Sequence, residues 1–60
     1  MDDALKKQIE ELKKLITKQE EVYAIAMSLR MDFHTLKHLR ERINKMKQEL
    51  EGLLNNNNLN

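Results

Sequence analysis

The sequence predicts an all-α fold, in which a short N-terminal helix and a long amphipathic helix form a helical hairpin or coiled coil and associate into an antiparallel helical bundle. Proline is absent and glycine occurs once, so the chain holds few residues that interrupt helices. Charged residues make up 35% of the chain and aromatic residues only 3%, a balance typical of long helices. Apolar residues also recur every seven positions from residue 22 to residue 53, which indicates a helix whose apolar stripe contacts another helix.

The length of the chain favours self-association. A lone domain of 60 residues buries only about 60% of the surface that its unfolded chain exposes, so its stability is marginal. The sequence contains no cysteine, so neither a disulfide nor a cysteine-bound metal can compensate. We therefore expect a second chain to complete the core of one small module that spans residues 1–54.

The charge and hydropathy of the chain bear on its expected partners and cellular location. A net charge of +1 is neither the strongly basic balance that is typical of nucleic-acid-binding proteins nor an acidic one. No apolar run approaches the roughly 20 residues that a bilayer-spanning helix needs. The acidic start Met1-Asp2-Asp3 also lacks the basic and then apolar layout of a signal peptide. We expect a soluble intracellular protein, in the cytoplasm by default, with no membrane partner.

The first helix is predicted over about residues 3–16. Asp2 and Asp3 can cap its start, because a carboxylate accepts hydrogen bonds from the free backbone N–H groups there. Its apolar residues follow at intervals of four, three and four, as one face of a helix requires. They are Leu5, Ile9, Leu12 and Ile16.

A turn is predicted near Thr17. The next apolar stripe begins at Val22, six residues after Ile16, where a continuous heptad needs seven. The loss of one residue rotates an apolar stripe by about 100° around a helix. Thr17 and Glu20 also have the spacing of a capping box at the start of a new helix.

The second helix is predicted over about residues 18–54 and carries the predicted interface. Its a and d heptad positions are apolar except for one d position, which Asp32 occupies. We interpret this carboxylate either as a specificity element that sets the register of the seam or as a local break in it. The predicted interface residues are Val22, Ile25, Leu29, Asp32, Leu36, Leu39, Ile43, Met46, Leu50 and Leu53.

A second possible position for the turn is Asp32 itself. Asp32 could cap the start of a helix, with Met31 and Leu36 spaced as a hydrophobic staple. This alternative gives a more symmetric hairpin, but it places the turn where no turn-forming residue occurs, so it ranks second. After the helix, residues 55–60 are rich in Asn and are predicted to fray, because Asn side chains compete with the helical backbone.

Few residues suggest chemistry. His34 and His38 share one helical face with Glu41, and such a set could hold a metal ion. The segment between the histidines lacks the Glu of helical metalloprotease motifs, so we expect two solvated histidines, no metal and no cofactor. No Ser–His pair or second carboxylate accompanies Asp32, so the sequence predicts no catalytic residue.

A group of basic residues offers another reading, a nucleic-acid-binding helix, because clustered cations can neutralise phosphates. No aromatic residue is interleaved with them and they spread around the helix, which favours a solvated role beside the seam. Arg42 would oppose Lys47 in a parallel pair and approach Glu21 in an antiparallel one, so we expect antiparallel association. The basic residues are Arg30, Lys37, Arg40, Arg42, Lys45 and Lys47.

The segment Gln48-Glu49-Leu50-Glu51 resembles the Ser-Gln-Glu-Leu-Asp motif of the small helical-hairpin phosphatases that dephosphorylate response regulators in sporulation. Residues 5–16 also resemble the first helix of that family. The Ser of the motif is Lys47 here and its Asp is Glu51, and the resemblance covers less than half of the chain. It implies, as an alternative function, a small regulator that docks on a protein partner and hydrolyses an aspartyl phosphate.

The residues themselves favour a different function. An apolar heptad seam without catalytic residues is typical of a non-enzymatic structural or interaction protein. We expect this module to associate with itself, or with another helical protein, through the seam.

Overall fold

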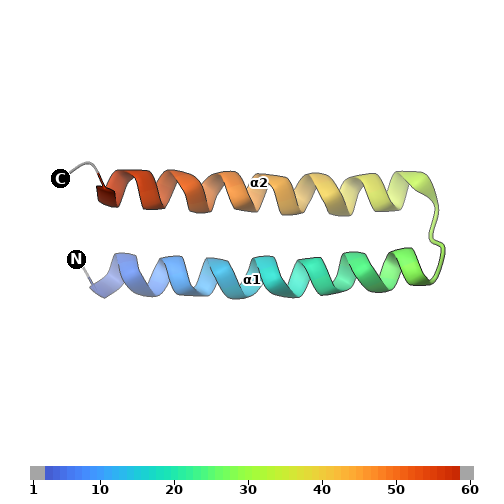
Figure 1. The fold of residues 1–60 in the computed structure, drawn as a ribbon, viewed down its shortest axis with the longest axis horizontal. Coiled ribbons are helices and arrows are strands. Elements are labelled where there is room, and N and C mark those ends of the chain that lie inside the picture. The colour runs from blue at the N-terminus through green and yellow to red at the C-terminus, as the bar shows by residue number, and fades with distance from the viewer. Residues whose placement is uncertain (1–2, 59–60) are drawn as a thin grey trace.

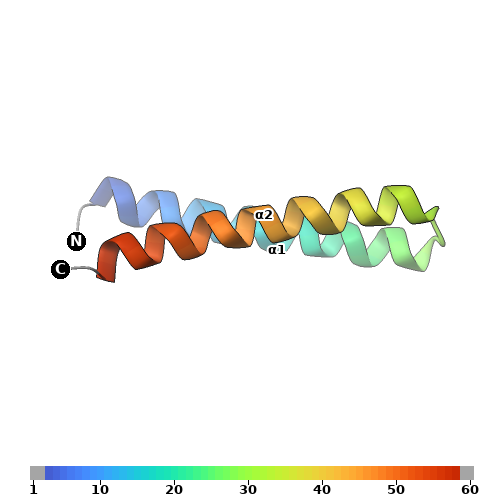
Figure 2. The same ribbon diagram turned by 90° about the horizontal axis from the view of Figure 1, so that it is seen from above.

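The computed structural model describes residues 3–58, with side chains for residues 3–55, and these residues form two antiparallel helices joined by a tight turn (Figure 1). Helix α1 spans Asp3–Ser28 and helix α2 spans Phe33–Asn58, so each has 26 residues. The helices pack side by side and cross at a shallow angle when seen from above (Figure 2). The molecule is elongated, with principal extents of 45 × 16 × 11 Å. The predicted all-α helical hairpin is confirmed.

Backbone hydrogen bonds end α1 at the turn. The N–H of Met31 donates to the carbonyl of Ala26 at 3.1 Å, and the N–H of Arg30 donates to the carbonyl of Met27 at 3.0 Å. These two bonds form a Schellman motif, which satisfies carbonyls that the last helical turn leaves free. The motif requires a left-handed backbone at its penultimate residue, and Arg30 supplies it with a φ of 56°.

The side chain of Asp32 starts α2. Its Oδ1 accepts a hydrogen bond from the backbone N–H of Thr35 at 3.4 Å, and its carbonyl accepts one from the N–H of Leu36 at 3.1 Å. A carboxylate in this N-cap position satisfies a free N–H group and lies at the positive end of the helix dipole. The turn therefore consists of two helix-capping arrangements placed back to back.

The left-handed backbone of Arg30 predicts a stabilising substitution. Arg30→Gly removes the Cβ that makes this conformation costly for other residues, and part of the gain is offset by the greater freedom of glycine in the unfolded chain. We expect the free energy of unfolding to rise by about 0.5–1 kcal/mol. Thermal unfolding followed by circular dichroism measures this, with Arg30→Ala as the control that loses the charge and keeps the Cβ. Equal stability of the two variants would contradict the prediction.

The position of the turn differs from the first-ranked prediction. Residues 17–21 lie inside α1, and the turn falls at residues 29–32, so the helices predicted over about 3–16 and 18–54 have the wrong bounds. Thr17 caps no helix, because its hydroxyl donates to the carbonyl of Lys13 at 3.1 Å, one turn earlier in α1. The alternative that placed the turn at Asp32 is the one that the structure adopts.

The core is a single seam between the two helices. On α1 the covered positions continue the spacing of Leu5 and Ile9 past the predicted slip, through half-buried Gln19 and Tyr23 to buried Ala26. On α2 the seam follows the predicted heptad. The buried residues are Ile9, Ile16, Ala26 and Ile43, which are 3–6% exposed. No described side chain is less than 2% exposed, so this seam makes a thin core.

The outer ends of the helices lie together, opposite the turn (Figure 1). Asp3, one of the two predicted caps, is in the first turn of α1, and Asp2 lies outside the described residues. Helix α2 continues beyond the predicted end at residue 54 as far as Asn58, so the first part of the predicted Asn-rich tail is helical. Residues 59–60 of that tail lie outside the described residues.

Candidate interaction surfaces

The predicted interface residues separate into two groups. The group on α2 belongs to the core of the hairpin, where Ile43 is buried and the others are half-buried. These residues pack against α1 of the same chain, because the turn at residues 29–32 folds the predicted continuous stripe back on itself. The members of this group are Leu36, Leu39, Ile43, Met46, Leu50 and Leu53.

The group on α1 is exposed. Val22, Ile25 and Leu29 keep 38%, 59% and 70% of their surface, so the packing of α1 on α2 does not cover them. Asp32 is exposed in the turn and caps α2, which corrects its interpretation as a polar residue that sets the register of a seam. The interruption of the heptad at this residue marks the start of a new helix.

The exposed apolar residues Leu15, Val22 and Ile25 of α1, together with Leu29 just after its last residue, form a second apolar stripe, which we call the outer stripe. Three of its members each precede a core residue by one position, namely Ile16, Tyr23 and Ala26. The outer stripe is therefore rotated by about 100° around α1 from the stripe that packs on α2. Lys18 occupies the remaining position of this heptad. The outer stripe consists of Leu15, Val22, Ile25 and Leu29.

Two shallow depressions flank the helix seam. One of about 340 Å³ lies toward the outer ends of the helices, where Leu15 of the outer stripe meets Leu53 and Glu49 of α2. The other, of about 220 Å³, lies nearer the turn between Tyr23 and Phe33. At Leu15 the outer stripe therefore borders the groove between the helices.

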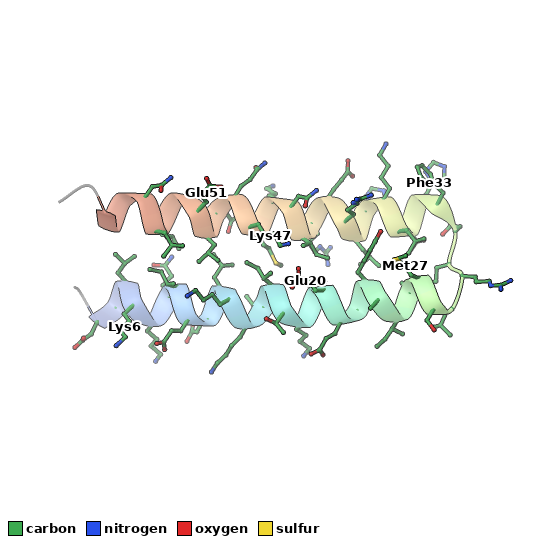
Figure 3. The ribbon with its side chains drawn as sticks, in the orientation of Figure 1. Lys6, Glu20, Met27, Phe33, Lys47 and Glu51 are labelled. Atoms are coloured by element: carbon green, nitrogen blue, oxygen red, sulfur yellow. The ribbon has the colours of Figure 1, made fainter. Side chains whose placement is uncertain are left out.

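An ion pair joins the two helices near their middle. Lys47 Nζ lies 3.0 Å from Glu20 Oε2, and the two side chains point toward each other across the groove (Figure 3). Their side chains are 54% and 48% exposed, so water screens the interaction and it contributes about 0.5 kcal/mol or less. The pair supports the antiparallel register of the hairpin more than its stability.

The residues considered for chemistry are dispersed over the surface. His34, His38 and Glu41 are exposed on α2, and the ring of His34 lies edge-on to that of Phe33 with centroids 6.2 Å apart. Among the described residues no three His, Cys, Asp or Glu side chains form a group that could hold a metal ion. In the segment 48–51, Leu50 is half-buried in the core and its three neighbours are exposed.

Sequence reasoning missed the division of the apolar residues of α1 into two stripes. The signal was present, because the intervals of four and three that begin at Leu5 continue through Gln19, Tyr23 and Ala26. The polar Gln19 hid that continuity. Val22, one residue before Tyr23, begins a heptad that has more apolar members and that continues through Leu36.

Comparisons of the chain with protein-family models, with curated proteins and with solved structures found no match. The resemblance to the sporulation phosphatases therefore depends on residues 48–51 and 5–16 alone. In the part of the chain that the structure describes, no helix combines the length and the apolar character needed to cross a membrane.

Proposed function

We propose that this chain is a non-enzymatic interaction module, a helical hairpin that associates with a second copy of itself through the outer stripe of α1. The outer stripe is the feature that supports this function. It places three large apolar side chains of α1, and Leu29 just past the end of this helix, at heptad spacing on one face, each at least 38% exposed. A contiguous exposed apolar face on a small protein is typical of a protein–protein contact.

The thin core of the hairpin gives this association a physical reason. A chain of this length covers too little apolar surface for ample stability, and a two-helix seam leaves one side of each helix uncovered. Residues 22–27 of α1 are apolar on nearly all sides, as expected for a helix with two neighbours. One neighbour is α2, and the other in this proposal is α1 of the second copy.

A second copy suits the outer stripe because an antiparallel pair of α1 helices is self-complementary. With the two-fold axis near residue 20, Leu15 of one copy lies level with Ile25 of the other. Lys18 then lies level with Val22, so its aliphatic stem covers an apolar side chain while its ammonium group approaches Glu21. Each such exposed charge pair contributes only about 0.3–0.5 kcal/mol, so the apolar contacts dominate.

The sequence predicts a bundle whose two chains meet through the longer, second helix. In the proposed arrangement the two chains meet through α1 instead. The α2 residues of the predicted interface remain inside each hairpin, and the four helices follow the order α2, α1, α1 of the second copy, α2 of the second copy. The proposed arrangement keeps the antiparallel orientation that the sequence predicts for the two contacting helices.

The test is sedimentation equilibrium over a range of concentrations, with Ile25→Asp as the disrupting variant. We expect the parent chain to change from one to two copies as concentration rises. Ile25→Asp should stay at the mass of one chain and remain helical, because the dimer would bury an unpaired charge and the hairpin would not. Ala24→Asp, at the neighbouring exposed position, is the matched control and should dimerise normally. A parent chain that stays at the mass of one copy at every concentration would refute the proposal.

A further inference from the structure

The turn end of the hairpin exposes a second set of large apolar side chains. They come from the last turn of α1, the turn itself and the first residue of α2, and Figure 3 shows two of them, Met27 and Phe33, at the turn end of the molecule. Phe33 is the most exposed of them, at 73%. We call this set the apolar tip, and it consists of Met27, Leu29, Met31 and Phe33. Leu29 also ends the outer stripe.

The excess positive charge of the chain lies at the same end. Between residues 22 and 42 there are four cationic residues, Arg30, Lys37, Arg40 and Arg42, and two acidic ones, Asp32 and Glu41. Residues 3–21 contain five of each sign, and residues 43–55 contain two of each. Counted over the whole turn half of the hairpin, residues 16–45, six cationic residues oppose four acidic ones, because Lys18, Lys45, Glu20 and Glu21 also lie there. The turn half is therefore cationic, and the remaining described side chains carry five charges of each sign.

The cations stand close behind the apolar tip. Arg30 is part of the turn, and the helical rise places Lys37 about 6 Å and Arg40 about 10 Å along α2 from Phe33. The Debye length at physiological ionic strength is about 8 Å, so Lys37 lies within it and Arg40 lies just beyond it, and both charges act on whatever the tip contacts. The side chains of Lys37 and Arg40 also line the depression of about 220 Å³ beside Phe33.

We propose that the apolar tip binds the surface of a membrane that contains anionic lipids. Phe33, Leu29 and Met31 insert at the boundary between the headgroups and the acyl chains, and Arg30, Lys37 and Arg40 contact the lipid phosphates. Exposed apolar side chains with cations behind them are the combination that holds peripheral proteins at such an interface. Binding of this kind needs no segment long enough to span the bilayer.

Charge and shape favour this occupant over two others. A second copy at the tip would bring two cationic ends together, whereas an anionic surface is complementary to one. A nucleic acid would satisfy the cations, but its phosphate backbone offers no apolar environment for Phe33 and Leu29. A lipid interface accommodates both features at once.

Co-sedimentation with vesicles tests the proposal. We expect the chain to bind vesicles of equal parts phosphatidylcholine and phosphatidylserine, to bind poorly to phosphatidylcholine alone, and to lose affinity as salt is raised. Phe33→Ser should weaken binding by about tenfold or more, because it removes the largest inserted side chain. Leu15→Ser is the matched control for the loss of an exposed apolar side chain. Because Leu15 belongs to the proposed dimer surface, both variants are measured at concentrations at which the chain is a single copy, where Leu15→Ser should bind as the parent chain does. Circular dichroism confirms that both variants are helical.

A second pair of variants tests the charge. Lys37→Gln combined with Arg40→Gln should weaken binding to the mixed vesicles, whereas Lys6→Gln combined with Lys7→Gln, at the opposite end, should change it little. Phe33→Trp serves as a probe of insertion, and its fluorescence should shift to the blue when mixed vesicles are added.

Three outcomes would overturn the proposal. Equal binding to both kinds of vesicle would remove the role of the cations. Equal losses in Phe33→Ser and Leu15→Ser would remove the role of the tip. If Phe33→Ser forms less dimer than the parent chain but binds vesicles equally well, the tip would be assigned to self-association instead. The dimer is tested separately, because Ile25→Asp lies outside the tip and should retain vesicle binding even as one copy.

Discussion

Replacing Ile43 with aspartate is expected to unfold the hairpin. Ile43 is 6% exposed and is the most deeply buried described residue of α2. Removing its side chain alone should cost about 2–5 kcal/mol. Placing a carboxylate in the seam adds the free energy of dehydrating a charge that has no partner there. A domain of this size has a total stability of only about 3–9 kcal/mol, so the two costs together exceed or match it.

The measurement is the helical signal in far-ultraviolet circular dichroism, recorded with the parent chain and two companion variants. Asn44→Asp introduces the same carboxylate at the next, exposed position and should change the stability by about 0.5 kcal/mol or less. Ile43→Val removes one methylene and should cost about 0.5–1.5 kcal/mol, which gives a graded series. Retention of the full helical signal by Ile43→Asp would show that the seam described for α2 is not the core.

The α2 half of the hairpin could be predicted from the sequence because one periodic pattern determines it. From Leu36 to Leu53 the apolar residues keep strict a and d spacing, and every polar residue in that span falls outside those positions. Such a pattern fixes both the helical period and the buried face. The same positions are half-buried or buried in the structure, although they face α1 of the same chain and not a second chain.

The α1 half could not be predicted in the same way, because it carries two apolar stripes that overlap. Near Val22 and Tyr23, adjacent residues belong to different faces, so more than one heptad register fits the apolar residues. The choice of register decides whether the turn is predicted near Thr17 or at Asp32. Leu29-Arg30-Met31-Asp32 contains no Gly or Pro, and the left-handed conformation of Arg30 is one that composition alone does not indicate. The sequence indicates the turn only through Asp32 as a possible N-cap and through Met31 and Leu36, which are spaced as a hydrophobic staple.

The two stripes also explain why the candidate surfaces could be only partly predicted. Val22, Ile25 and Leu29 are exposed apolar residues at heptad spacing, but the same heptad joins them to α2 positions that the hairpin covers. An apolar heptad identifies a face that needs a partner. It does not identify whether that partner is the next helix of the same chain, and only the position of the turn decides this.

Replacing Gln19 with leucine is expected to stabilise the hairpin by about 1 kcal/mol. Gln19 is half-buried at a seam position of α1, and counting nine residues away from the turn on each helix pairs it with Arg42, one position before the seam residue Ile43 of α2. Leucine at this position adds roughly 50 Å² of covered apolar surface, and each Å² contributes about 25 cal/mol. The two residues have nearly equal helix propensity, so the gain comes from packing. A rise of about 4–8 °C in the midpoint of thermal unfolding should accompany it.

Gln48→Leu is the matched control, since it makes the same exchange at an exposed position of α2 and should leave the midpoint within about 2–4 °C of the parent value. The double variant Gln19→Leu with Ile43→Ala gives a sharper test of the register. If the two residues share a layer, leucine at position 19 loses its packing partner, and the gain from Gln19→Leu should shrink when Ile43 is truncated. An undiminished gain would place Gln19 opposite another part of α2, and the register derived from the turn would then be wrong.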